Sequence, residues 1–267
     1  MRRKIIAGNW KMHMLTAEGR ALARELAPLG KEAPGTDVIV CPPYTALSAV
    51  GEVLAGSGVH LGAQDVFWKE KGAYTGQVAP AMLVDIGVSH VIVGHSESRG
   101  RFGVPEPGMD DAVLAHFGDS DKTVNLKLRA ARAAGLIVLC CVGETLAERE
   151  AGQTDAVVSR QVAGALEGLD AGELAGVVMA YEPVWAIGTG KTCEADEADR
   201  VCGVIRSEVG RLFGGSAADA IRIQYGGSVK PGNAGDLLGR PNIDGALVGG
   251  ASLVAADFAA IVKACPA

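Results

Sequence analysis

The sequence predicts an α/β protein folded as a single (β/α)8 barrel domain that spans residues 1–267. Two observations predict this fold: eight short, almost continuously apolar runs recur along the chain, and segments with helical spacing lie between them. Strands that are apolar on both faces are typical of buried parallel sheets, and a closed barrel of this kind needs about 250 residues. The alternative is an open doubly wound sheet, but no GxGxxG motif follows the first strand.

The expected strands share runs of β-branched and other apolar residues. They are residues 4–8, 37–41, 59–63, 90–94, 136–143, 177–182, 221–227 and 245–250. Apolar residues at helical spacing predict helices at 16–27, 121–134, 154–169 and 194–212. The last of these begins with acidic residues, which stabilise the N-terminal end of a helix dipole. Strand therefore alternates with helix, as in a parallel sheet.

One stretch interrupts this alternation. Between residues 102 and 121 the chain reads GVPEPGMDDAVLAHFGDS, with two prolines and two glycines near its start. These residues break regular structure. We interpret the stretch as a surface excursion after the fourth strand, with a short amphipathic segment at residues 110–117.

Composition and charge exclude several classes of protein. The net charge is −6 and no basic block is present, so a nucleic-acid partner is not expected. No run approaches the roughly 18 apolar residues of a membrane helix, and the apolar run near the N-terminus is too short for a signal peptide. The six cysteines match no zinc or CxxC pattern. We therefore expect a reduced, cytoplasmic protein with no membrane partner.

Polar and charged residues gather directly after the expected strands. In a barrel these positions lie at the C-terminal face, where active sites are built. The residues are Asn9, Lys11, Gln64, Asp65, His95, Glu97, Glu144, Glu182, Tyr225 and Ser228, together with glycine pairs at 226–227 and 249–250. Each has an ordinary structural interpretation when taken alone: a carboxylate that caps a strand, a buried histidine, a surface lysine, or glycines in turns.

The combination of these residues favours proton transfer next to a carbonyl group. Glycine-rich turns after the seventh and eighth strands predict a phosphate site, to which Ser228 adds a hydroxyl. Glu182 offers a base, His95 an electrophile and Lys11 a positive charge, all around one cavity. No serine or cysteine nucleophile is paired with a base in this set, and no metal-ligand spacing is present.

The residues carry a resemblance to the triosephosphate isomerase family over essentially the whole chain. The thirteen-residue stretch AYEPVWAIGTGKT at residues 180–192 is the most specific match. The other motifs occur in the family's order. They are GNWKM at 8–12, GAQ at 62–64, GAYTG at 72–76, GHSE at 94–97, CVGE at 141–144, QYGGSV at 224–229 and LVGGASL at 247–253.

This resemblance implies a TIM barrel that interconverts dihydroxyacetone phosphate and D-glyceraldehyde 3-phosphate without a metal or an organic cofactor. Glu182 matches the family's general base and His95 its electrophile. Lys11 would supply positive charge, Asn9 would help to position the substrate, and Glu97 matches a residue behind Lys11 and His95. Triosephosphate isomerases are themselves the established example of a neutral histidine whose pKa is lowered by a helix N-terminus, so the resemblance implies a neutral His95.

Residues 183–191 match the family's mobile lid, whose closure would exclude water and oppose β-elimination of the phosphate. The remaining functional residues follow from the resemblance alone. Gly188, Ser228, Gly249 and Gly250 would bind the phosphate, Tyr225 and Ser228 would latch the closed lid, and Thr75 would contact the second subunit of a homodimer.

The chain departs from the family where relatives carry an ion pair across the dimer interface. Ser98 stands in place of the usual Arg and Gln77 in place of the usual Glu. Losing one partner would strand a buried charge at a cost of about 3–5 kcal/mol, whereas losing both avoids it, so we expect a dimer with a neutral contact. Asp65 and His13 replace asparagines near the same interface.

The excursion, at about residues 103–117, adds roughly fifteen residues over common relatives. Our hypothesis is that it lies beside the dimer interface or the rim of the pocket. A free surface flap is the alternative.

Three rival functions remain on the sequence alone. An isomerase of a tetrulose phosphate, such as erythrulose phosphate, would use the same proton chemistry. A non-catalytic barrel would not need Lys11, His95 and Glu182 together. A barrel synthase with the same phosphate site would lack the lid motif.

Overall fold

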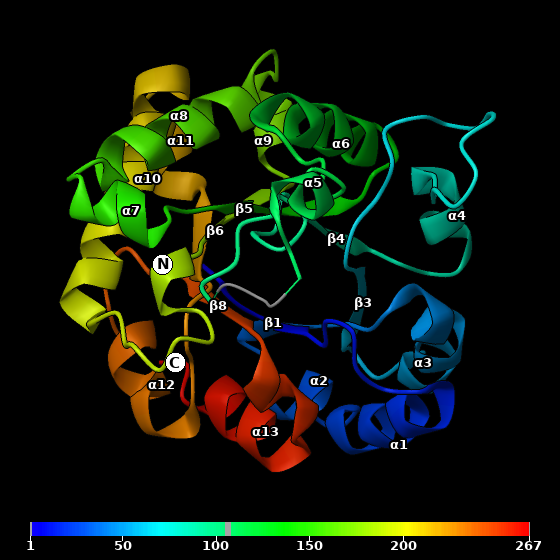
Figure 1. Cartoon of the computed structure of the whole chain (residues 1–267). Coiled ribbons are helices and arrows are strands. Elements are labelled where there is room, and N and C mark those ends of the chain that lie inside the picture. The colour runs from blue at the N-terminus through cyan, green and yellow to red at the C-terminus, as the bar shows by residue number, and fades with distance from the viewer. Residues whose placement is uncertain (1, 105–107, 267) are drawn as a thin grey trace.

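The computed structural model describes residues 2–104 and 108–266, and within them eight parallel strands close into a barrel. Each strand pairs with the next in the chain, and β1 closes the ring by pairing Ile5 with Gly245 of β8. The predicted (β/α)8 fold is confirmed (Figure 1). The strands are β1 Lys4–Asn9, β2 Thr36–Cys41, β3 His60–Ala63, β4 His90–Val93, β5 Ile137–Val142, β6 Val177–Tyr181, β7 Arg222–Tyr225 and β8 Gly245–Val248.

Helices surround the barrel on all sides in Figure 1. The longer ones are α1 Thr16–Leu26, α3 Leu47–Leu54, α6 Asp121–Ala133, α8 Thr154–Leu166, α10 Ala195–Phe213, α12 Pro231–Leu238 and α13 Ala255–Lys263. The short ones are α2 Leu29–Glu32, α4 Pro80–Asp85, α5 Asp111–Leu114, α7 Leu146–Glu150, α9 Ala171–Leu174 and α11 Gly215–Ala220. The described residues also form 3-10 turns at η1 Tyr44–Ala46, η2 Val184–Ala186 and η3 Gly250–Leu253. None of the helices in the described part of the chain is long and apolar enough to cross a membrane.

Two apolar clusters explain why the strands read as continuous apolar runs. In β1, Ile5 and Ala7 belong to the cluster that fills the barrel, whereas Ile6 belongs to the shell between the strands and the helices. Alternate residues of a strand point to opposite faces. Because both faces are covered here, both sets of residues are apolar, and the usual alternation with polar residues disappears.

The predicted strands overlap the observed ones, with shifted ends. Residues 226–227 and 249–250 were predicted to be strand residues but lie beyond the ends of β7 and β8, and Gly250 begins η3. Glycines there turn the chain instead of continuing the ladder. The four predicted helices correspond to α1, α6, α8 and α10, and α3, α12 and α13 were not predicted. These three are only eight or nine residues long, so their apolar pattern spans barely two turns.

The excursion after β4 is closed at its base. The N–H of Asp119 donates to the carbonyl of Ser98 at 3.2 Å, and the rings of Phe102 and Phe117 meet edge to face with centroids 5.6 Å apart. The predicted amphipathic segment at 110–117 contains the single helical turn α5. Residues 105–107 of the predicted excursion lie outside the described residues.

Candidate active site

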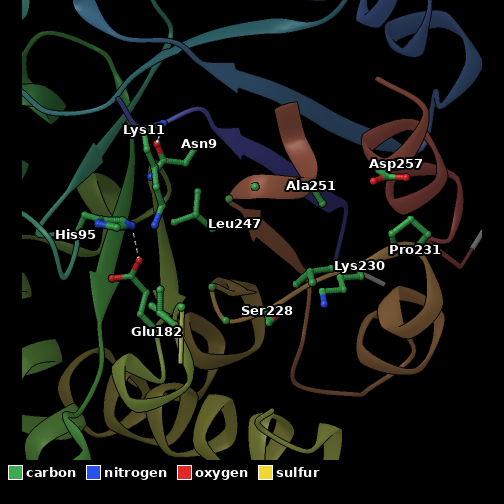
Figure 2. Close-up of a pocket in the computed structure, with 17 residues that line it drawn as sticks. Asn9, Lys11, His95, Glu182, Ser228, Lys230, Pro231, Leu247, Ala251 and Asp257 are labelled. Carbon is green, nitrogen blue, oxygen red and sulfur yellow. Dashed lines mark hydrogen bonds and ion pairs between the residues drawn. The ribbon is translucent and has the colours of Figure 1, made fainter. Parts of the chain in front are cut away.

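One cavity of about 540 Å³ opens at the C-terminal ends of the strands, as is usual for this fold. Eight of the sequence-predicted site residues line it: Asn9, Lys11, His95, Glu182, Gly188, Ser228, Gly249 and Gly250. Glu97 and Tyr225 lie behind the lining. Thr75 is on the exposed loop between β3 and α4, away from this cavity. Figure 2 shows Glu182 and His95 facing each other beneath Lys11, with Ser228 and Lys230 farther along the pocket.

Glu182 follows β6 directly and is almost completely buried, with 2% of its surface exposed. One carboxylate oxygen, Oε1, lies 2.9 Å from Nε2 of His95, and the other accepts a hydrogen bond from the N–H of Ser96 at 2.9 Å. Gly226 makes room for this side chain, because a Cβ at that position would lie 2.9 Å from Cγ of Glu182. Burial raises the pKa of Glu182, but His95, the N–H of Ser96 and Lys11 together outweigh burial and hold the pKa below its usual value.

His95 follows β4 and is oriented through both of its ring nitrogens. Its Nδ1 accepts a hydrogen bond from the N–H of Glu97 at 3.2 Å, which leaves the ring proton on Nε2, the nitrogen facing Glu182. Burial lowers the pKa of His95, but the carboxylates of Glu182 and Glu97 together more than offset burial and raise it. The expectation of a lowered pKa is therefore wrong for this arrangement, because the base rests against the ring.

Lys11 is held in a strained conformation at the end of β1. Its φ of 51° lies in the left-handed region, which non-glycine residues rarely adopt. The side-chain oxygen of Asn9 accepts from the N–H of Lys11 at 3.0 Å, and the Gln64 amide donates to the Lys11 carbonyl at 2.8 Å. The ammonium pairs with Glu97 at 2.6 Å. Strain of this kind persists only where surrounding contacts impose it. The contacts with Asn9, Gln64 and Glu97 therefore fix the backbone and the ammonium of Lys11.

The far end of the cavity is lined by the two glycine-rich turns. Ser228 and its glycine pair follow β7, and Gly249 and Gly250 lead into η3. The Ser252 hydroxyl donates to the Gly249 carbonyl at 2.7 Å and fixes that turn. Together these turns surround a space suited to an anion.

Residues 183–191, which we call the lid, begin next to Glu182. Trp185 is buried, and its indole N–H donates to Glu144 Oε1 at 2.9 Å, the same oxygen that accepts from the Tyr181 hydroxyl at 3.1 Å. The Arg149 guanidinium lies 4.3 Å from the centre of the Trp185 ring. Burial raises the pKa of Glu144. Gly188 and Gly190, by contrast, are exposed, so the second half of the lid has little to hold it.

Several contributing residues escaped the sequence analysis. Lys230, Pro231 and Asp257 line the outer end of the pocket, and Ile187 and Leu247 add apolar surface. Lys230 follows the QYGGSV motif directly, so proximity to that motif was the available signal. Nothing in the sequence marked Asp257, which reaches the pocket from α13. Within the described ranges, no group of three or more His, Cys, Asp or Glu side chains is arranged to hold a metal ion.

Comparisons with known proteins agree with this geometry. The sequence model of the family described as triosephosphate isomerase matches residues 4–265. A protein named triosephosphate isomerase from Moorella thermoacetica is 54% identical over 263 residues, which cover 98% of this chain and 99% of the relative. Relatives with the same name from Citrifermentans bemidjiense and Rhodopirellula baltica are 50% and 48% identical, over 98% and 99% of this chain and 99% and 98% of their own.

Proposed function

This chain belongs to the triosephosphate isomerase family, and from that membership we infer that it interconverts dihydroxyacetone phosphate and D-glyceraldehyde 3-phosphate. It is an intramolecular aldose–ketose isomerase that acts in glycolysis and gluconeogenesis. The relatives carry the name of the triose enzyme, which favours this activity over isomerisation of a tetrulose phosphate. A cytoplasmic location is part of the proposal.

The observation that carries the mechanism is the facing pair of Glu182 and His95 at the mouth of the barrel. In the proposed reaction Glu182 takes a proton from the carbon beside the carbonyl and returns it to the neighbouring carbon. His95 donates a hydrogen bond from its Nε2–H to the carbonyl oxygen and thereby stabilises the enediolate. Since Nδ1 already accepts from the Glu97 N–H, a neutral imidazole suits this role once Glu182 has left the ring.

The other site residues serve binding and orientation. Lys11 supplies positive charge beside the reacting oxygens, with Glu97 fixing its ammonium and Asn9 its backbone. The phosphate binds between Ser228 and the glycines at 249–250, which opposes elimination once the lid closes. Gly188 approaches the phosphate with the lid.

Closure of the lid is supported by the contrast between its buried start and its exposed glycines. Tyr225 and Ser228 latch the closed lid onto its backbone. The Tyr225 hydroxyl lies directly against Gly227, because a Cβ at that glycine would collide with it.

We also propose that the protein works as a homodimer. Residues 69–77, in the loop between β3 and α4, are exposed and protrude from the barrel in Figure 1. Met12 and Leu15, beside the active-site lysine, are 95% and 76% exposed, which is unusual for large apolar side chains. A second copy that covers these residues, with Thr75 at the contact, removes them from water.

A coupled assay with D-glyceraldehyde 3-phosphate tests the function and the base. The Glu182→Gln enzyme lacks the carboxylate that accepts the proton, so we expect kcat to fall by roughly 10³-fold or more. Glu182→Asp withdraws the carboxylate by one methylene group and should lower kcat by about 10²-fold.

Glu167→Gln, at an exposed position, is the matched control and should keep the parent rate. An inactive parent would overturn the function, and a Glu182→Gln enzyme as active as the parent would overturn the assignment of the base. Turnover of erythrulose phosphate faster than of the triose would favour the rival substrate.

A further inference from the structure

Gly103, at the start of the excursion after β4, lies directly against the backbone of the lid. A Cβ at this position would lie 2.2 Å from the carbonyl oxygen of Ile187 and 2.5 Å from that of Val184. Both neighbouring atoms belong to the backbone, so no rotamer change relieves such a collision. With the lid in this position, residue 103 must therefore be glycine.

The position of Gly103 is fixed by the residue two places before it. The N–H of Arg101 donates to the carbonyl of Ser96 at 2.9 Å, and its guanidinium donates to the Gly143 carbonyl at 3.2 Å and pairs with Glu148. Arg101 thus ties the start of the excursion to the segment that follows β5. The contact to the lid is made by an anchored backbone, with Phe102 additionally packed on Phe117.

The same loop after β4 also holds the base in its resting place. The N–H of Ser96 donates to Glu182, and the lid starts at the next residue, Pro183. Glu182 must leave Ser96 to reach a substrate, and the lid must leave Gly103 if it is to close over the pocket. One loop therefore contacts both parts that the reaction has to move.

We propose that Gly103 is a positioning residue for the lid. Its bare backbone is the surface on which the lid rests when open, and this contact sets the balance between open and closed lid. The proposal rests on the isomerase function above and adds to it a role for the excursion. The closed state binds the reacting anion, so its population sets the apparent affinity.

Substituting Gly103→Ala places a methyl group against the two lid carbonyls and disfavours the open state alone. We expect the Kd of 2-phosphoglycolate, a planar carboxylate that mimics the enediolate, to fall at least threefold. KM should fall by a similar factor. The kcat value should also fall at least threefold, because product release requires the open lid.

Gly118→Ala is the matched control within the excursion. A Cβ there meets nothing within 4 Å, and its backbone lies outside the left-handed region. This variant should keep kcat, KM and inhibitor affinity within twofold of the parent.

The lid itself can be followed through Trp185. In enzyme labelled with 5-fluorotryptophan, the Trp185 fluorine resonance is assigned with a Trp185→Phe variant. For Gly103→Ala without ligand, we expect this resonance to shift toward the position seen with 2-phosphoglycolate, and for Gly118→Ala we expect the parent position. Arg101→Gln removes the guanidinium contacts that hold the start of the excursion and adds no methyl group. We expect it to shift the Trp185 resonance in the same direction by a smaller amount.

If Gly103→Ala does not fold, the same measurements are made on the Arg101→Gln variant. Kinetic constants and a Trp185 resonance unchanged from the parent, in whichever of these variants folds, would refute the proposal. Weaker inhibitor binding would refute it as well. Failure of the isomerase function is separate, because it appears as an inactive parent.

Discussion

In the proposed reaction, Glu182 must leave the contacts that it makes in this structure. Both carboxylate oxygens of Glu182 are occupied, one by His95 and one by the Ser96 N–H. The ammonium of Lys11 is paired with Glu97. In the reaction proposed above, the substrate anion joins Glu97 as a partner of Lys11 and takes the place of Glu182 beside His95. Binding energy from the phosphate end can drive this rearrangement, which links binding to catalysis.

A second residue-scale feature lies at the opposite end of the barrel. His90 is buried on β4, its ring centre is 5.0 Å from that of His60, and within the described residues its Nε2 has no hydrogen-bond partner. Burial, reinforced by His60 and Arg222 and opposed by Asp37, lowers the pKa of His90 to about 3. Its protonation in the unfolded chain, near pH 6.5, therefore favours unfolding.

The stability contributed by neutral His90 is complete above about pH 6.5 and is lost as the pH falls toward 3. Between pH 7.5 and 5.0 we expect the free energy of unfolding to fall by about 2 kcal/mol from this group alone. Urea denaturation at fixed protein concentration measures the change. His90→Gln cannot be protonated and should show a dependence flatter by that amount. Equal slopes for the two proteins would exclude His90 as the source.

At the scale of elements, the lid joins a buried start, which rests against Gly103, to a solvent-exposed end. The N–H of Val184 donates to the Glu144 carbonyl at 3.1 Å, and Trp185 bonds the Glu144 side chain, so η2 is anchored to the segment after β5. Past Ile187, the glycines at 188 and 190 have positive φ and face solvent. The exposed glycines should therefore move farthest, while residues 184–187 move by less when they leave Gly103.

Helix α6, which ends the excursion, depends on its first residues. The Ser120 hydroxyl accepts from the Thr123 N–H at 3.2 Å, and the Thr123 hydroxyl accepts from the Ser120 N–H at 2.8 Å. Ser120→Ala removes one half of this capping box and should cost about 1 kcal/mol in the free energy of unfolding, measured in urea. Ser120→Asp keeps an acceptor and should stay close to the parent. A loss of equal size in both variants would contradict the capping explanation.

At the scale of the whole molecule, the exposed Met12 and Leu15 and the protruding loop at residues 69–77 support the proposal of a homodimer. Sedimentation at micromolar concentration should give the mass of two chains. Thr75→Arg places a charged side chain at the proposed contact and should shift the protein toward monomer, because an unpaired charge buried in an interface is strongly unfavourable. Ser216→Arg, on exposed α11 across the barrel from the loop in Figure 1, is the control and should stay dimeric. A parent that sediments only as monomer would overturn the dimer.

The sequence by itself determined the barrel and which residues gather at its mouth. Apolar runs covered on both faces marked the strands, and Asn9, Lys11, His95 and Glu182 could be expected at one face because parallel strands end on the same side. The glycine pairs after the last two strands indicated the phosphate end in the same way. Local pattern is enough for these conclusions, because strand periodicity and strand direction are local properties.

Only the tertiary structure decided how these groups meet. Contact of His95 with Glu182 reverses the expected direction of the His95 pKa, and it joins residues that are far apart in the chain. The apolar pattern of the sequence likewise does not indicate the strained φ of Lys11 or the closeness of Gly103 to the lid. The physical reason is that burial, electrostatic coupling and steric fit depend on distances between side chains and backbone across the fold, which a linear pattern does not contain.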